Sequence, residues 1–79
     1  MNIYLLRPFN TESGPWKPWY DKAFGFVVRA ANEEEARRFA SLEHGDEGQF
    51  PWFDKLATSC EILNGEGPEG VIIKDYARA

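Results

Sequence analysis

The sequence predicts an α+β domain in which an antiparallel sheet of about four strands carries one helix on a face, in the order β-β-α-β-β. Three observations support this class. Residues 22–30 alternate apolar side chains at period two, residues 32–45 carry the start and stop signals of a helix, and residues 64–70 form a loop rich in Gly and Pro between two apolar runs. The 79 residues are expected to form one small domain, 1–79, because this length leaves no room for a second core.

The first two strands are predicted at residues 2–7 and 22–30. In the first, Tyr4 and Leu6 point to one face and Ile3 and Leu5 to the other, and Pro8 ends the run. The second is expected to be the central strand of the sheet. One face of it carries four apolar side chains at alternate positions: Phe24, Phe26, Val28 and Ala30.

One helix is predicted to follow, beginning after Asn32 and stopping at Gly45. Asn32 is a favourable N-cap, and Glu35 three residues later completes the pattern of a capping box. Ala36, Phe39 and Ala40 are expected to face the sheet, with Phe39 packed onto it. The opposite, solvent-facing side is predicted from two ion pairs at i,i+4, which are Glu33 with Arg37 and Glu34 with Arg38.

Two further strands are predicted after the helix, at residues 59–63 and 70–77. Both are short apolar runs, and the intervening NGEGPEG is a loop by composition. The segment QFPWFDKLA between the helix and the third strand fits either an irregular loop or a single helical turn.

An aromatic hexapeptide occurs twice in nearly the same form, as PWYDKA at 18–23 and PWFDKL at 51–56. Two copies with dissimilar flanks do not make a repeat array, so we interpret them as local recurrence. Such aromatics often close the ends of a small core. If each copy makes one helical turn, the tryptophan can also stack on the lysine three residues later. The chain nevertheless holds more large aromatics than one helix and a small sheet hide easily, so some are expected to be exposed.

Composition and charge narrow the function classes. The formal net charge is −4, and residues 40–79 hold eight acids against three bases, which disfavours direct binding to nucleic acid and favours a protein with a basic surface as partner. One cysteine, Cys60, and one histidine, His44, form neither a disulfide nor a zinc cluster, and no catalytic set is recognisable. We therefore expect no enzymatic activity and no cofactor. With no signal peptide and no membrane span recognisable, a soluble cytoplasmic protein is expected.

The predicted function is a protein-binding module whose aromatic side chains anchor a partner and whose acidic residues orient it. The candidate partner-binding residues are Trp16, Trp19, Tyr20, Trp52, Phe53, Glu43, Asp46 and Glu47. The alternative is a protein that binds or sequesters a small, nucleotide-like ligand between stacked aromatics and cations. Its candidate residues are Trp19, Tyr20, Trp52 and Phe53 with Lys22, Lys55, Arg7 and Arg29. Neither hypothesis specifies an oligomeric state.

The stretch PWKPWYDKAFGFVVRA, together with NEEEAR and GDEG, resembles a group of uncharacterised short single-domain proteins of bacteria and their phages. In general style, being tiny, acidic and rich in aromatics, the chain is also similar to phage-encoded inhibitors of host defence, including anti-CRISPR proteins. That resemblance implies an inhibitor that covers a basic, nucleic-acid-binding surface of its target. It rests on no specific motif and assigns no functional residue.

Overall fold

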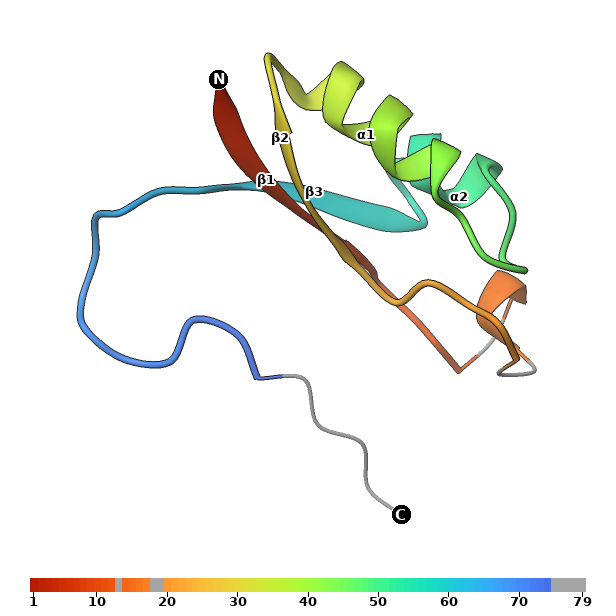
Figure 1. Cartoon of the computed structure of the whole chain (residues 1–79). Coiled ribbons are helices and arrows are strands. Elements are labelled where there is room, and N and C mark those ends of the chain that lie inside the picture. The colour runs from red at the N-terminus through yellow and green to blue at the C-terminus, as the bar shows by residue number, and fades with distance from the viewer. Residues whose placement is uncertain (13, 18–19, 75–79) are drawn as a thin grey trace.

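The computed structural model describes residues 1–12, 14–17 and 20–74 of the chain. Its elements follow the order β1 (Asn2–Pro8), the 3-10 helix η1 (Gly14–Trp16), β2 (Phe26–Ala30), α1 (Glu33–Leu42), α2 (Phe50–Phe53) and β3 (Thr58–Leu63). The class is α+β, as predicted, with a three-stranded antiparallel sheet and one main helix. Figure 1 shows both helices on the same side of the sheet.

The sheet has the order β2-β1-β3, so β1 is its central strand and β2 lies at an edge. The prediction that residues 22–30 form the central strand is therefore wrong. β1 pairs antiparallel with both neighbours, and Leu6 lies opposite Phe26 on one side and opposite Cys60 on the other. Three consecutive residues of β1, Tyr4, Leu5 and Leu6, are buried. A strand buried on both faces is typical of a sheet centre.

Strand β2 is shorter than the strand predicted at residues 22–30, because the first residues of that range bond to other parts of the chain. The strand begins at Phe26, and residues 22–25 are outside the ladder. The N–H group of Ala23 donates to the Glu47 carboxylate and its carbonyl accepts from the Trp16 indole. From Phe26 onward the predicted alternation is confirmed, since Phe26 and Val28 pack against the core and Val27 between them is exposed.

The fourth predicted strand is not present in the part of the chain that the structure describes. Residues 70–74 have no strand conformation, and 75–77, the rest of the prediction, lie outside the described residues. The preceding loop contains Gly67 and Gly70 with φ values of 137° and 148°, a region that favours glycine. The apolar side chains of Val71 and Ile72 lie in water and not against the sheet, so the apolar sequence alone does not place this segment in the ladder.

The helix α1 begins where the sequence predicts. Asn32 Oδ1 accepts a hydrogen bond from the Glu35 N–H group at 2.9 Å, which confirms the N-cap. Ala36 and Ala40 are buried against the sheet, as predicted, but Phe39 differs from the prediction, because it is partly exposed under the Arg38 guanidinium. The buried side of α1 is formed by Ala36, Arg37, Ala40 and Ser41, and Phe39 lies beside it.

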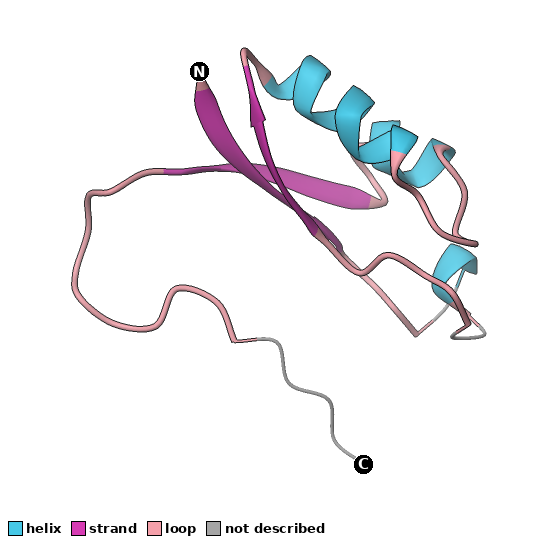
Figure 2. Ribbon diagram, viewed as in Figure 1, coloured by secondary structure: helices cyan, strands magenta, loops and turns pink. Residues whose placement is uncertain are grey.

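Two tryptophans fill the core between the sheet and the helices. The Trp16 and Trp52 rings meet edge to face with centroids 5.6 Å apart, and Phe26 contacts Trp52 in the same manner at 4.7 Å. Around them lie the buried residues Tyr4, Leu6, Ala30, Ala36 and Ala40. The expectation that hexapeptide aromatics close the core is thus confirmed for Trp52. Among the described residues, no helix covers the opposite face of the sheet (Figure 2).

Candidate functional site

The two hexapeptide segments are joined by the carboxylate of Glu47. Oε1 accepts the Ala23 N–H group of the first segment at 2.9 Å, and Oε2 accepts the Trp52 indole N–H of the second at 2.7 Å. The N–H group of Gly45 donates to both oxygens at 3.0 Å. Glu47 is 6% exposed, and its donors compensate the removal of its charge from water. Glu47 therefore connects the two recurring hexapeptides in the fold.

Close packing of the turn before α2 against the first segment depends on Gly45. A Cβ atom at this position would overlap the backbone carbonyl of Asp21, and the Asp46 N–H group donates to that same carbonyl at 2.7 Å. The turn that the sequence assigns as a helix stop is thus also a contact with residues 20–23. This contact places the backbone of Asp21 beside Asp46.

Hydrogen-bond donors lower the pKa of Glu47. Burial alone raises the pKa of this carboxyl, but the N–H group of Ala23, the indole of Trp52 and the N–H group of Gly45 outweigh burial and hold the pKa below the usual glutamate range. A carboxyl with a lowered native pKa stabilises the fold above its unfolded pKa, about 4.3, and this contribution is lost as the pH falls through the native pKa.

The stability difference between the wild type and Glu47→Gln is therefore expected to be largest near neutral pH and to shrink below about pH 4.3. The amide places an NH₂ group against N–H donors, so the variant is less stable at neutral pH. Urea unfolding at several pH values measures the difference. A difference that stays constant from about pH 3 to 7 contradicts the assignment, because protonation of Glu47 would then not be coupled to folding.

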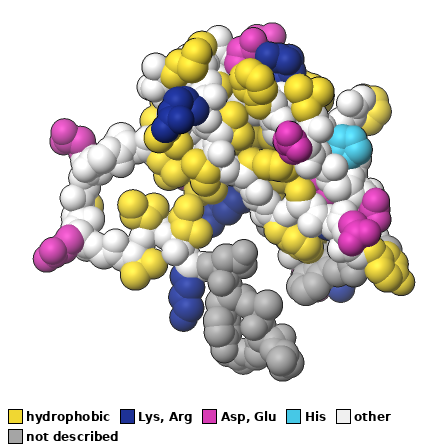
Figure 3. Space-filling view, in the orientation of Figure 1, with side chains coloured by type: hydrophobic (Ala, Val, Ile, Leu, Met, Phe, Trp, Pro, Cys, Tyr) yellow, Lys and Arg dark blue, Asp and Glu magenta, His cyan; other side chains and the backbone are white. Residues whose placement is uncertain are grey.

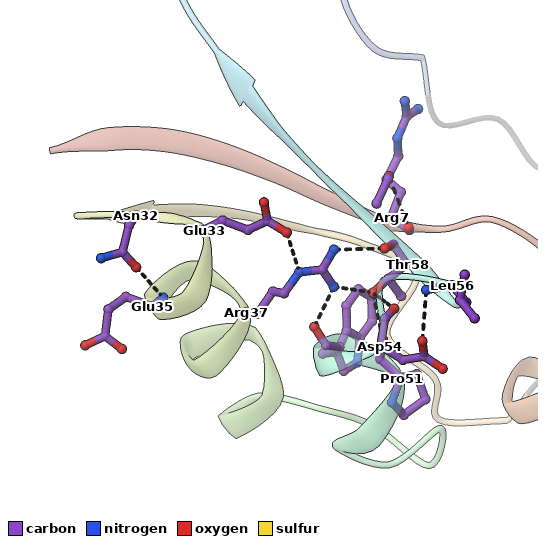
Figure 4. Close-up of polar contacts among 11 residues, drawn as sticks. Arg7, Asn32, Glu33, Glu35, Arg37, Pro51, Asp54, Leu56 and Thr58 are labelled. Atoms are coloured by element: carbon purple, nitrogen blue, oxygen red, sulfur yellow. Dashed lines mark hydrogen bonds and ion pairs between the residues drawn. The ribbon is translucent and has the colours of Figure 1, made fainter.

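A second buried polar group, Arg37, ties α1 to the second hexapeptide and β3 (Figure 4). Its guanidinium donates to the carbonyls of Trp52 and Thr58, to the Thr58 hydroxyl and to the carboxylate of Glu33, at 2.8–3.0 Å. The Thr58 hydroxyl in turn donates to the Pro51 carbonyl at 2.7 Å. The predicted pair of Glu33 with Arg37 is present, but Arg37 is buried instead of solvent-facing. Arg38 pairs with Glu35, not with Glu34.

The exposed part of this end is an aromatic surface on α2. Phe50 is 79% exposed and Phe53 is 48% exposed, whereas Pro51 and Trp52 between them are buried. Positions three apart lie on the same side of a helical turn. Both phenylalanines border a groove of about 540 Å³ that is also lined by Pro15, Asp54 and Ala57. We call Phe50, Phe53 and this groove the aromatic surface.

The structure separates the predicted partner-binding residues into two groups. Tyr20, Phe53, Glu43 and Asp46 are exposed, as an interface requires, while Trp16, Trp52 and Glu47 are buried in the fold and cannot serve as surface anchors. Trp19 lies outside the described residues. Phe50 was not among the predicted residues. Its i,i+3 spacing to Phe53 in FPWF would have indicated it once one helical turn was assumed.

Acidic side chains accompany the aromatic surface. Asp54 lines its groove directly, and Glu43 and Asp46 are exposed in the segment that connects α1 to α2. In the space-filling view, Asp and Glu side chains gather near the histidine with hydrophobic side chains beside them (Figure 3). This end of the molecule therefore combines large apolar groups with negative charge.

The alternative ligand site is not assembled as predicted. Trp52 is fully buried while Lys55 is exposed, so their expected stacking does not occur. Arg7 and Arg29 lie on the sheet face away from the helices, because they share faces with Leu5 and Ile3 in the register. Trp19, the remaining indole of this set, is outside the described residues.

Cys60 and His44 are the other candidate reactive groups that the sequence singled out. No cluster of three or more His, Cys, Asp or Glu side chains suited to a metal occurs among them. Burial, followed by the nearby charge of Glu33, raises the pKa of the Cys60 thiol, which keeps it protonated at neutral pH. The His44 ring lies on the surface, with Nδ1 2.7 Å from the Gly45 carbonyl oxygen.

Comparisons with protein-family models, curated proteins and solved structures found no significant match. Among the described residues, no helix has both the length and the apolar character needed to cross a membrane.

Proposed function

We propose that this protein is a non-enzymatic protein-binding module that uses the aromatic surface on α2 to engage a partner with a basic surface. The observation that carries the proposal is the exposure of two phenylalanines on a helical turn whose other two residues are buried. Large aromatic side chains near the centre of an interface contribute most of its binding energy. A protein that leaves two of them in water gains by covering them.

The aromatic surface is held rigidly, which favours binding. Pro51 restricts the backbone at the start of α2, Trp52 is fixed by Glu47, and the Trp52 carbonyl accepts from Arg37. A turn fixed in this way loses little conformational entropy when a partner binds. The two phenylalanines need no rearrangement of the backbone to serve as anchors.

The charge of the surrounding residues supports a basic partner. Asp54 lies in the groove, and the exposed Glu43 and Asp46 add negative charge at the same end of the fold. Complementary charge raises the association rate and orients the encounter. In its most concrete form, the proposal is an inhibitor of phage or mobile-element origin, anti-CRISPR-like, that covers a basic, nucleic-acid-binding surface of a host defence complex.

The proposal is tested by capturing partners from a bacterial lysate and then measuring affinity for the purified partner. Phe50→Ala with Phe53→Ala is expected to remain folded by circular dichroism and to weaken binding by about 2 kcal/mol or more, roughly 30-fold. Ile62→Ala is the matched control, since Ile62 is an exposed apolar residue of β3. Equal binding by the double variant would exclude the aromatic surface as the interface.

The same assay tests the charge. Glu43→Gln with Asp46→Asn is expected to slow association, with the difference shrinking at high salt. Glu34→Gln with Glu61→Gln changes the net charge equally at exposed positions on α1 and β3 and is the control. If both pairs of substitutions slow association equally, the effect depends on net charge and not on the positions of Glu43 and Asp46.

A further inference from the structure

The tail that follows β3, residues 64–74, carries an apolar run in water. Val71 and Ile72 are 84% and 78% exposed, and Ile73 is 41% exposed. Three consecutive β-branched residues are typical of a strand and unusual in an exposed loop. The run is therefore suited to pairing with a strand that has a free edge.

The strand β2 offers such an edge, since the order β2-β1-β3 gives it a partner on one side. The tail comes close to this strand on the face of the sheet away from the helices. Ile73 and Lys74 line a groove of about 380 Å³ there, together with Leu5, Arg7 and residues 24–27. Figure 1 shows the tail leaving β3, turning in a wide arc and returning on the sheet side away from the helices.

The direction of the tail matches that of an antiparallel partner. β3 ends at Leu63, which lies opposite Ile3, and Ile3 lies opposite Arg29 near the end of β2. From there the tail proceeds to the groove at residues 24–27, near the beginning of β2. The tail and β2 therefore run in opposite directions along the sheet.

We propose that residues 69–74 of the tail close as a strap onto the free edge of β2 in the same molecule, forming an antiparallel strand with Val71 opposite Val27. This register places Ile73 opposite Gly25 and Glu69 opposite Arg29. It keeps Ile73 beside the residues with which it shares the groove. The Glu69 and Arg29 side chains then form an oppositely charged cross-strand pair.

The same register distributes the apolar side chains correctly between the two faces. Val71 and Ile73 join Val27 and Leu5 on the face without helices, where Leu5 is only 6% exposed. Ile72 falls on the other face beside Phe26. Gly25 has no side chain, so the larger Ile73 has space above it. A shift by one residue would reverse every one of these placements.

Closure has a consequence for association. A free strand edge beside an exposed apolar run promotes pairing between chains, and covering the edge removes that route. The strap would thus keep this sheet from adding strands of other molecules. This role is independent of the aromatic surface on α2.

Disulfide trapping tests the proposal. In a Cys60→Ser background, Val27→Cys with Val71→Cys is expected to form an intramolecular disulfide under mild oxidation, because directly opposed residues bring their Cβ atoms within bonding range. The control pairs Val27→Cys with Ile72→Cys, whose side chains would lie on opposite faces. It is expected to cross-link at least tenfold more slowly. Non-reducing electrophoresis and peptide mapping measure both rates.

Three results would overturn the proposal. Equal rates for both cysteine pairs would describe a tail without fixed register, and no cross-link in either pair would place the tail elsewhere. A cross-link formed between two chains would show that a second copy occupies the edge of β2. Circular dichroism before oxidation establishes that each variant is folded, so that the comparison concerns the tail alone.

Discussion

Replacing Arg37 with alanine is expected to lower the free energy of unfolding by about 3–5 kcal/mol. The substitution removes every donor that the guanidinium supplies to the carbonyls of Trp52 and Thr58, which lie where water cannot replace them. It also separates α1 from the segment that carries α2. Urea unfolding followed by circular dichroism measures the change. A loss of this size is a large fraction of the stability of a domain of 79 residues.

The neighbouring Arg38 is a matched control. Arg38 is exposed and pairs with Glu35 at 2.6 Å, the arrangement of a surface ion pair. Arg38→Ala is therefore expected to change the free energy of unfolding by less than about 1 kcal/mol. Equal losses for the two variants would show that helix propensity or charge, not the buried hydrogen bonds of Arg37, determines the effect.

Trp52→Ala is expected to destabilise the protein by about 3–5 kcal/mol. The change leaves a cavity beside Trp16 and Phe26 and removes the indole donor of Glu47. Phe50→Ala, on the same helical turn, removes an exposed ring and is expected to cost less than about 1 kcal/mol. Thermal unfolding of the two variants compares a buried aromatic with an exposed one in the same helical turn.

Trp52→Phe separates the two contributions of Trp52. It retains an aromatic ring in the core but lacks the N–H group that donates to Glu47. An intermediate loss is expected. A Trp52→Ala variant as stable as the wild type would contradict the core role of this side chain.

Local signals in the sequence were sufficient for several elements. The N-cap of α1 depends on a side chain that accepts from an N–H group three residues later, so Asn32 and Glu35 could be assigned directly. The alternation in β2 reflects one buried face, which period two reveals. These features depend on neighbours in the chain.

The remaining features depend on contacts between distant residues. Nothing near Glu47 in the sequence indicates that its carboxylate binds Ala23, more than twenty residues earlier. Arg37 has the i,i+4 pattern of a surface ion pair, and only the position of Thr58 on β3 explains its burial. Likewise, Trp52 and Phe53 are adjacent aromatic residues of the second hexapeptide. Tertiary packing determines that Trp52 belongs to the core and Phe53 to the surface.

The edge-to-face contact of Trp16 and Trp52 gives the protein an internal optical reporter. Two indoles at 5.6 Å couple their electronic transitions, and such coupling produces a pair of circular dichroism bands of opposite sign only while the rings keep their mutual orientation. The two rings come from η1 and α2, segments separated by the whole of β2 and α1. The band pair therefore reports on the packing between the early and late segments of the chain without an added label. Its decay during unfolding shows whether that packing is lost before or after the helix.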